Sequence, residues 1–400
     1  MGQPLIIDVD THVAEAADVW TARMSKKKWG DLVPEVRVAD GKECWFVGSK
    51  NMGLVAASSI IRINPETGER FRQPLGTEFH SGAGFHELHP SSYDAAERLK
   101  AMDELGVHAA VVYPNLNLVV NDLHEASDDP EYKIEIIRAY NDWLIEWSSV
   151  DPLRLLPTAL VAYFDVNAAA EEIYRSKEIG HRGLVMTGVP QLHKMPPLAD
   201  DYWAPMWKAA EDTHLSIGFH VGANEEIMSK WVNPARLSAE GPLKMGARAV
   251  TEALLGNAAV LNDLLLSGVL PKYPDLKLVM VETGMGWVNF CLESADYHFD
   301  RYGVSAAHDE FTEPPSFYYR KQCYTTYWFE KMHSFHIDRL GANTIMFETD
   351  FPHSTSLERA DVEWVVNEGL SMASDDAKEQ ILWRNAADLY DVPLPAVATA

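Results

Sequence analysis

The sequence predicts an α/β fold, a (β/α)8 TIM barrel with an extended insertion after the first strand. Apolar, strand-like runs alternate with amphipathic, helix-like stretches from residue 91 onward, which is typical of parallel βα units. Counting the first run, there are eight such strands, the number that closes a barrel. A doubly wound open sheet is the alternative, but no G-x-G-x-x-G motif follows the first strand.

The first predicted strand, residues 5–13, begins apolar and then carries Asp8, Asp10 and His12 at alternate positions. Alternate residues of a strand point to the same face, so three possible metal ligands share one side. Two carboxylates so close together on an apolar strand are costly to bury unless a positive group lies between them. A bound cation is the simplest such group, and we expect Asp8 to lie one layer deeper than the metal. The alternative is a surface strand with a solvated acidic face.

The inserted region at about 13–93 is irregular, and we expect one or two hairpins there rather than a second domain. The chain is therefore predicted to form a single barrel domain over residues 1–400. The insertion ends with three histidines, His80, His86 and His89. In one interpretation they cap turns of a solvated loop. In the other, His80 folds over the barrel mouth as an additional metal ligand or substrate contact.

The remaining strands and helices follow in regular alternation. The strands are expected at 107–114, 153–161, 183–186, 215–220, 276–281, 322–327 and 344–350. The helices are expected at 92–105, 129–147, 167–176, 203–212, 247–268, 287–301, 331–340, from 357, and at 375–390.

Polar residues stand where these predicted strands end. They are Asp10 and His12 on the first strand, His220 on the fifth, Glu282 after the sixth and Asp350 on the eighth. Barrel enzymes carry their chemistry at the C-terminal ends of the strands. A single histidine such as His220 is more often a core residue, but five polar side chains at strand ends of one barrel indicate a site. Imidazole and carboxylate together suit Zn²⁺, Mn²⁺ or Fe²⁺.

The sequence resembles the amidohydrolase superfamily. The similar branch is the amidohydrolase-related, metal-dependent one that holds aminocarboxymuconate-semialdehyde decarboxylase and aromatic-acid decarboxylases alongside hydrolases. The resemblance covers nearly the whole chain. Its motifs are Asp10-x-His12, Arg98-Leu99-x-x-Met102-Asp103, Asn141-Asp142-Trp143-Leu144, Asp151-Pro152-x-Arg154, Phe219-His220-Val221-Gly222, Glu282-Thr283-Gly284-x-Gly286-Trp287, Thr349-Asp350-Phe351-Pro352-His353 and Asn385-Ala386-Ala387.

The resemblance implies that Asp10, His12, His220 and Asp350 bind a divalent metal, Zn or Mn if it is mononuclear. Asp350 would also serve as the acid/base group. His353 would hold the substrate or orient Asp350. Its other interpretation is a loop histidine at the barrel rim.

Glu282 departs from the family pattern, because the decarboxylases usually carry a histidine at this strand end. A carboxylate is a poor hydrogen-bond donor to an anionic substrate, so Glu282 is either a catalytic group or a further metal ligand. The expected activity is hydrolysis or non-oxidative decarboxylation of a small carboxylate-bearing compound, aromatic ones included. The alternative is an oxygenase with a dinuclear non-haem iron or mixed-metal centre completed by Glu282 and His80. A third possibility is a pseudoenzyme that serves as a structural subunit.

Composition limits the partners. The chain has 400 residues, 47% hydrophobic and 23% charged, which is ordinary for a globular protein with a large core. A formal net charge of −25 disfavours nucleic acid and anionic membranes. The three cysteines form no C-x-x-C pair, no signal peptide is visible, and no apolar run approaches the ~18 residues of a membrane span. We expect a cytoplasmic enzyme with a small-molecule substrate, as a homo-oligomer such as a dimer or with a related subunit.

Overall fold

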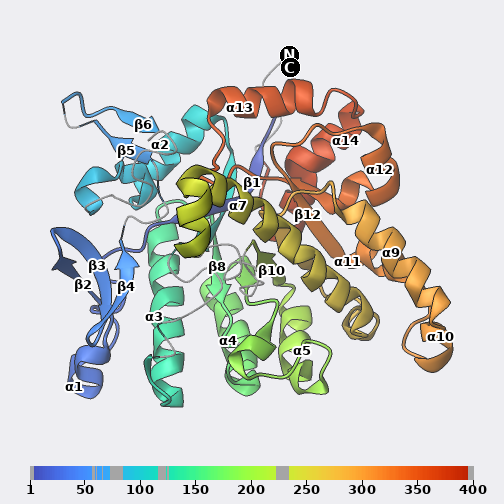
Figure 1. Cartoon of the computed structure of the whole chain (residues 1–400), viewed down its shortest axis with the longest axis horizontal. Helices are drawn as coiled ribbons and strands as arrows, with labels where there is room; N and C mark the ends of the chain where they lie inside the picture. The colour runs from blue at the N-terminus through green and yellow to red at the C-terminus, as the bar shows by residue number, and fades with distance from the viewer. Residues whose placement is uncertain are drawn as a thin grey trace.

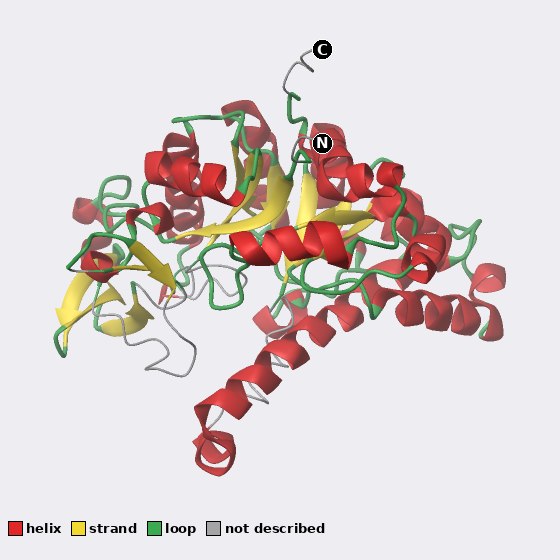
Figure 2. Cartoon of the chain, turned by 90° about the horizontal axis from the view of Figure 1, so that it is seen from above, coloured by secondary structure: helices red, strands yellow, loops and turns green. Residues whose placement is uncertain are grey.

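The computed structural model confirms the (β/α)8 barrel. It describes residues 4–55, 59, 61–64, 66–72, 84–115, 123, 126–221 and 234–394. Eight parallel strands form one sheet in chain order: β1 (Ile7–Val13), β7 (Ala109–Pro114), β8 (Leu155–Leu160), β9 (Gly183–Val185), β10 (Ser216–His220), β11 (Leu278–Val281), β12 (Cys323–Tyr327) and β13 (Ile345–Phe347). Figure 2 shows these strands at the centre of the molecule with helices outside them.

The sheet closes between its first and last strands. The Asp350 N–H donates to the Asp10 carbonyl at 3.0 Å, and the His12 N–H donates to the Phe351 carbonyl at 2.7 Å. On its other side β1 pairs with β7, where His12 lies opposite Tyr113. This seam brings the polar side chains of the first strand next to those that follow the last one.

Helices surround the barrel where the apolar periodicity places them. They are α2 (Ala95–Leu105), α3 (Pro130–Ser148), α4 (Val166–Ile179), α5 (Ala204–Thr213), α7 (Pro234–Leu266), α8 (Val269–Lys272), α9 (Val288–Arg301), α10 (Val304–Ala307), α11 (Pro315–Gln322), α12 (Ser334–Leu340), α13 (Arg359–Trp364), α14 (Asp375–Glu379) and α15 (Asn385–Tyr390). Asp94 caps α2 by accepting from the Glu97 N–H, and Gly106 ends that helix in left-handed backbone (φ 80°). Asp129 and Pro130 begin α3.

The insertion after β1 contains the expected hairpins, two of them joined into one sheet, and one more. It contains a short helix, an antiparallel three-stranded sheet and a hairpin: α1 (Lys26–Trp29), β2 (Glu35–Ala39), β3 (Lys42–Val47), β4 (Lys50–Leu54), β5 (Ile61–Ile63) and β6 (Arg70–Arg72). The three-stranded sheet lies beside α3 (Figure 1). Trp20 and Trp45 meet edge to face with ring centroids 5.0 Å apart, and the Trp20 indole N–H donates to the Ile136 carbonyl of α3 at 3.2 Å. The insertion therefore shares an apolar core with the barrel helices.

Helix α7 differs from the predicted helix at 247–268 because it begins earlier, with a break at Gly241 (φ 75°) and Pro242. By length and composition alone it is the one helix within the described ranges that could cross a membrane, contrary to the sequence expectation. However, 44% of its most apolar stretch is buried, and Leu261 and Leu264 belong to the main core. A core helix of a barrel passes the same test.

Candidate metal centre

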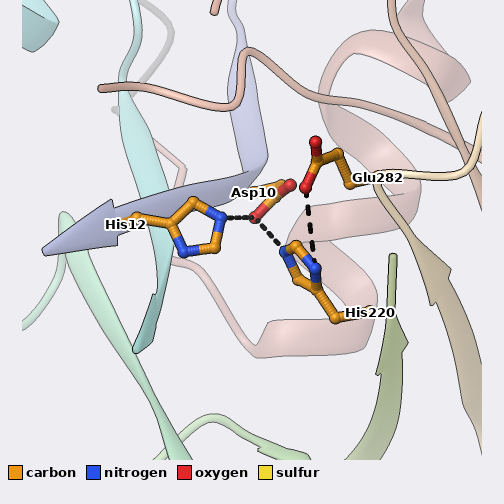
Figure 3. Close-up of side chains that lie close together, drawn as sticks. All are labelled: Asp10, His12, His220 and Glu282. Atoms are coloured by element: carbon orange, nitrogen blue, oxygen red, sulfur yellow. Dashed lines mark hydrogen bonds and ion pairs between the residues drawn. The ribbon is translucent and has the colours of Figure 1, made fainter. Parts of the chain in front are cut away.

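Six polar side chains meet at the C-terminal ends of the strands, and we call them the mouth cluster: Asp10, His12, His220, Glu282, Asp350 and His353. The first two lie on β1, the third ends β10, the fourth follows β11 directly, and the last two follow β13. All six are buried. Figure 3 shows Asp10 between the two strand histidines, with the Glu282 carboxylate pointing toward His220.

The distances within the cluster are those of groups that face a common point. Asp10 Oδ1 lies 3.3 Å from both His12 Nε2 and His220 Nε2. His12 Nε2 lies 3.5 Å from Asp350 Oδ1, and His220 Nδ1 lies 3.6 Å from Glu282 Oε2. In two overlapping groups of four residues, the candidate ligand atoms all lie within 4.8 Å of one another. The structure thus brings together every strand-end residue that the sequence indicated.

Two atoms on the β1 residues of the cluster lack a hydrogen-bond partner. Asp10 Oδ2 and His12 Nε2 are buried and make no hydrogen bond with the residues that the structure describes. A buried polar atom left in this way costs about 1–3 kcal/mol. A divalent cation bound at this point would satisfy both atoms, and the imidazole and carboxylate donors suit Zn²⁺, Mn²⁺ or Fe²⁺. The residues present therefore fit a divalent metal.

Neighbouring groups fix the orientation of the two strand histidines. His12 Nδ1 lies 3.0 Å from the Pro114 carbonyl, so this nitrogen carries the proton and Nε2 presents its lone pair to the cluster. Buried Arg98 donates to the His12 carbonyl at 2.5 Å, which gives the family-like Arg98 motif a structural role. The Asn257 amide donates to the His220 carbonyl at 3.2 Å.

The electrostatics of the site also favour a bound cation. Burial, followed by the nearby His353, lowers the pKa of His12 to about 4, so its imidazole is neutral as a metal ligand must be. Burial alone would raise the pKa of Asp10, but His220 and His12 outweigh it and the pKa lies below the ordinary value. Burial and the surrounding carboxylates raise the pKa of Glu282 well above its ordinary value. A cation would lower the cost of ionising it.

His353 lies against Asp350 rather than at the rim of the barrel. Its Nδ1 is 2.8 Å from Asp350 Oδ1, and its ring stacks on His12 with centroids 3.9 Å apart. Its Nε2 is 2.9 Å from Asn115 Oδ1, and the Asn115 N–H donates to Glu15 at 2.9 Å. The geometry therefore supports the interpretation that His353 orients Asp350, and it adds Asn115, which the sequence did not indicate.

The histidines of the insertion are not part of the mouth cluster where the structure describes them. His80, predicted as a metal ligand, lies outside the described residues. His86 is exposed, and its Nε2 lies 4.0 Å from Glu87. His89 caps the turn at Pro90–Ser92, where its Nδ1 accepts from the Ser91 N–H at 3.2 Å. His86 and His89 thus have the structural roles of loop histidines.

Sequence reasoning missed one carboxylate at the site. Glu348 is fully buried, and its Oε2 accepts from the Glu282 N–H at 3.0 Å. The signal was available, because Glu348 and Asp350 alternate just as Asp8 and Asp10 do on the first strand. Asp8 itself precedes the mouth cluster on β1 and hydrogen-bonds within the barrel, as expected.

Comparison with known proteins agrees with this geometry. Residues 7–392 match the family described as amidohydrolase. The chain belongs to the amidohydrolase family.

This amidohydrolase is similar to two curated decarboxylases. It is 26% identical over 313 residues to a gamma-resorcylate decarboxylase of Polaromonas sp., a match that covers 73% of this chain and 86% of the relative. It is 27% identical over 332 residues to a gamma-resorcylate decarboxylase of Rhodococcus jostii, covering 78% and 92%.

Solved structures share the fold. An amidohydrolase from Mycobacterium avium subsp. paratuberculosis matches with a TM-score of 0.76 and 21% identity, over 98% of this chain and all of that one (100%). The 5-carboxyvanillate decarboxylase of Sphingomonas paucimobilis matches with a TM-score of 0.64 and 18% identity, over 98% and 100%. A dihydroxybenzoic acid decarboxylase of Polaromonas sp., solved with manganese and the inhibitor 2-nitroresorcinol, gives 0.62 and 18%, over 98% of both chains.

Proposed function

We propose that this amidohydrolase is a metal-dependent carboxy-lyase that removes CO2 from a small aromatic carboxylate without net oxidation. One observation carries the proposal: imidazole and carboxylate donors gather at the strand ends, and Asp10 Oδ2 and His12 Nε2 are buried without a partner. The two curated relatives support this reaction, because both are gamma-resorcylate decarboxylases.

Asp10, His12, His220 and Asp350 would hold the metal. Mn²⁺ is the proposed ion, since a fold relative was solved with manganese bound; Zn²⁺ and Fe²⁺ suit the same donors. When bound, the metal supplies positive charge that binds and orients the oxygens of the substrate.

Asp350 is the proposed acid. As the bond between the ring and the carboxylate breaks, its electron pair stays on the ring carbon, which takes a proton from the Asp350 carboxyl while CO2 leaves. No oxidant is consumed. His353 is placed to hold Asp350, with its Nδ1 2.8 Å from Oδ1, and Asn115 holds His353 from the other side. Reprotonation of Asp350 from water completes the cycle.

Hydrolysis is the second candidate, and Glu282 is the observation that favours it. Its carboxylate stands at a strand end where decarboxylases of this branch usually carry a histidine, and it lies 3.6 Å from His220 Nδ1. In a hydrolase, Asp350 would take a proton from the attacking water and pass it to the leaving group. The oxygenase alternative has no support among the relatives named above.

Three further expectations are kept as proposals. The sparse, unpaired cysteines support a cytoplasmic location. The apolar core shared by the insertion and the barrel supports one domain over residues 1–400. We also propose a homo-oligomer, such as a dimer, or an assembly with a related subunit.

The test measures products from metal-depleted protein reloaded with Mn²⁺, Zn²⁺ or Fe²⁺ in the absence of O2. The substrates are 2,6-dihydroxybenzoate, 5-carboxyvanillate and esters of the same rings. We expect CO2 and the decarboxylated phenol in equal amounts, and their loss in Asp350→Asn. Release of the alcohol from an ester without CO2 would favour hydrolysis. Turnover that starts only on admission of O2 would overturn both in favour of the oxygenase.

A further inference from the structure

Two carboxylates lie one step deeper in the barrel than the mouth cluster, and we call them the lower carboxylate pair. They are Asp8 and Glu348, with 1% and 0% of their surface exposed. Each precedes a proposed ligand of its own strand by two residues, Asp10 in one case and Asp350 in the other. Burying a carboxylate is costly, so each member of the pair needs a physical reason to be there.

Asp8 joins the two edges of the barrel seam. Its Oδ1 accepts from the Asp10 N–H at 3.1 Å and from the Thr349 N–H at 2.9 Å, and its Oδ2 accepts from the Thr349 hydroxyl. Asp8 therefore holds the backbone immediately before Asp350, which belongs to the last strand and not to its own.

Glu348 makes a similar contact between the segments that follow β13 and β11. Its Oε2 accepts from the Glu282 N–H at 3.0 Å, while its Oε1 has no hydrogen-bond partner among the described residues. Glu348 directly follows β13 and holds the backbone of Glu282, the mouth carboxylate that follows β11.

The two carboxylates above the lower pair have unusual backbone conformations. Glu282 has φ 53° and Asp350 has φ 59°, the left-handed region that favours glycine. This conformation costs a non-glycine residue roughly 1–2 kcal/mol and persists only where surrounding contacts impose it. Strain of this kind concentrates at functional sites. Here it falls on Glu282, whose own N–H is held by Glu348, and on Asp350, where Asp8 holds the preceding N–H of Thr349.

We propose that Asp8 and Glu348 are positioning residues. By accepting from the Thr349 and Glu282 N–H groups, they keep the left-handed turns at Asp350 and Glu282 and so aim both carboxylates at the metal. The inference rests on the proposed metal-dependent function. The carboxylate oxygens of the pair act only as acceptors, because each side chain contacts the backbone N–H of another residue and not the proposed metal.

The test compares variants that remove the acceptor with variants that keep it. Asp8→Ala and Glu348→Ala remove it, whereas Asp8→Asn and Glu348→Gln retain a carbonyl oxygen of the same reach. The probe is Co²⁺, whose d–d absorption is titrated into metal-free protein. We expect the alanine variants to bind Co²⁺ about 10–100-fold more weakly, the usual cost of losing an outer partner of a metal ligand. The asparagine and glutamine variants should stay within about threefold of the wild type, below that range.

Glu172→Gln is the matched control, because Glu172 is a buried carboxylate far along the chain from the site and should leave Co²⁺ affinity unchanged. Thr349→Val removes the hydroxyl that donates to Asp8 and accepts from the Phe351 N–H, and should weaken binding even if Asp8→Ala does not fold. Alanine variants that bind Co²⁺ like the wild type would overturn the inference, as would amide variants as weak as the alanine ones. A wild type that binds no Co²⁺ would instead overturn the proposed function.

Discussion

Two clusters of this protein each contain buried carboxylate and histidine side chains, and the buried charge is neutralised in different ways. The first, which we call the shell cluster, lies among α3, α4 and the start of β9: Arg138, Asn141, Glu172, Arg175 and His181. In it Glu172 accepts from Arg138 at 3.0 Å, from Arg175 at 2.8 Å and from the Asn141 amide at 2.9 Å. His181 Nε2 lies 3.2 Å from the Asn141 carbonyl. Every partner of the buried carboxylate comes from the protein.

The mouth cluster has no such partners. Within the described part of the chain, no lysine or arginine forms an ion pair with any carboxylate of that cluster or with Glu348. Burial raises the pKa of Glu172 too, but hydrogen bonds from Arg175 and Asn141 outweigh it and the pKa lies below its ordinary value. For Glu348 burial dominates, and the pKa lies well above the ordinary value. This chain thus places arginines around the buried acid of the shell cluster, and none beside the described buried acids that we propose to be functional.

The largest expected effect is on the reaction itself. Asp350→Asn keeps the shape of the side chain but removes the proton donor, so kcat for CO2 release should fall about 10³-fold, within the range for a lost general acid. The measurement is CO2 release at saturating substrate, with metal content determined on the same sample. Wild-type kcat in this variant at equal metal content would show that Asp350 is not the proton donor.

The shell cluster gives the next effect, on stability against pH. Burial is the main cause that lowers the pKa of His181 to about 4 from its usual 6.5, so the folded protein keeps this ring neutral. Below pH 6.5 the His181 ring is protonated in the unfolded chain but stays neutral in the folded protein. The contribution of neutral His181 to stability is therefore fully present above pH 6.5. It is lost as the pH falls towards 4, which lowers the unfolding free energy by about 3 kcal/mol.

Denaturant titrations at pH 7 and 4.5 check this, with His181→Gln as the comparison variant. Its amide can still donate to the Asn141 carbonyl but does not titrate. The pH dependence should shrink in His181→Gln; an unchanged slope would place the acid sensitivity elsewhere.

Metal removal should distinguish the two clusters directly. A ligand at 100 times its Kd stabilises the folded state by about 2.7 kcal/mol, so metal-free protein should melt at a lower temperature and recover on addition of Mn²⁺. His220→Ala should lose this recovery, because it removes a ligand. His181→Gln should keep it, since the shell cluster takes no metal. Equal responses of the two variants would contradict the assignment of the clusters.

The smallest effect is expected from Glu172→Gln. The variant leaves Arg138 without its carboxylate, whereas Arg175 keeps its ion pair with Asp142. Both arginines reach solvent, so the loss should be about 2 kcal/mol of unfolding free energy rather than the full penalty of a broken buried pair. Its kcat should match the wild type. A large fall in kcat would show that the shell cluster is linked to the site.

The sequence predicted the barrel and most of the site for a physical reason. Period-two alternation on a strand places Asp10 and His12 on one face, and a parallel barrel puts the ends of all its strands at one mouth, so His220, Glu282 and Asp350 had to converge there if the fold was right. Local patterns combined with one topological rule were sufficient.

Other features depend on contacts between distant segments, which no local pattern encodes. Asn115 supports His353 only because the ends of β7 and β13 lie close together in the folded barrel. The three-stranded sheet of the insertion could not be distinguished from hairpins, since its strands are short and mostly half-buried. Glu348 is different, because its alternation with Asp350 could have been recognised.

The most direct test of the account is the metal content of protein purified without added metal or chelator, measured per chain beside His220→Ala and Glu172→Gln. The account predicts roughly one equivalent of a divalent metal in the wild type and in Glu172→Gln, and almost none in His220→Ala, as for a mononuclear site that has lost one of its ligands. A wild type without metal that also takes up none on titration would contradict it.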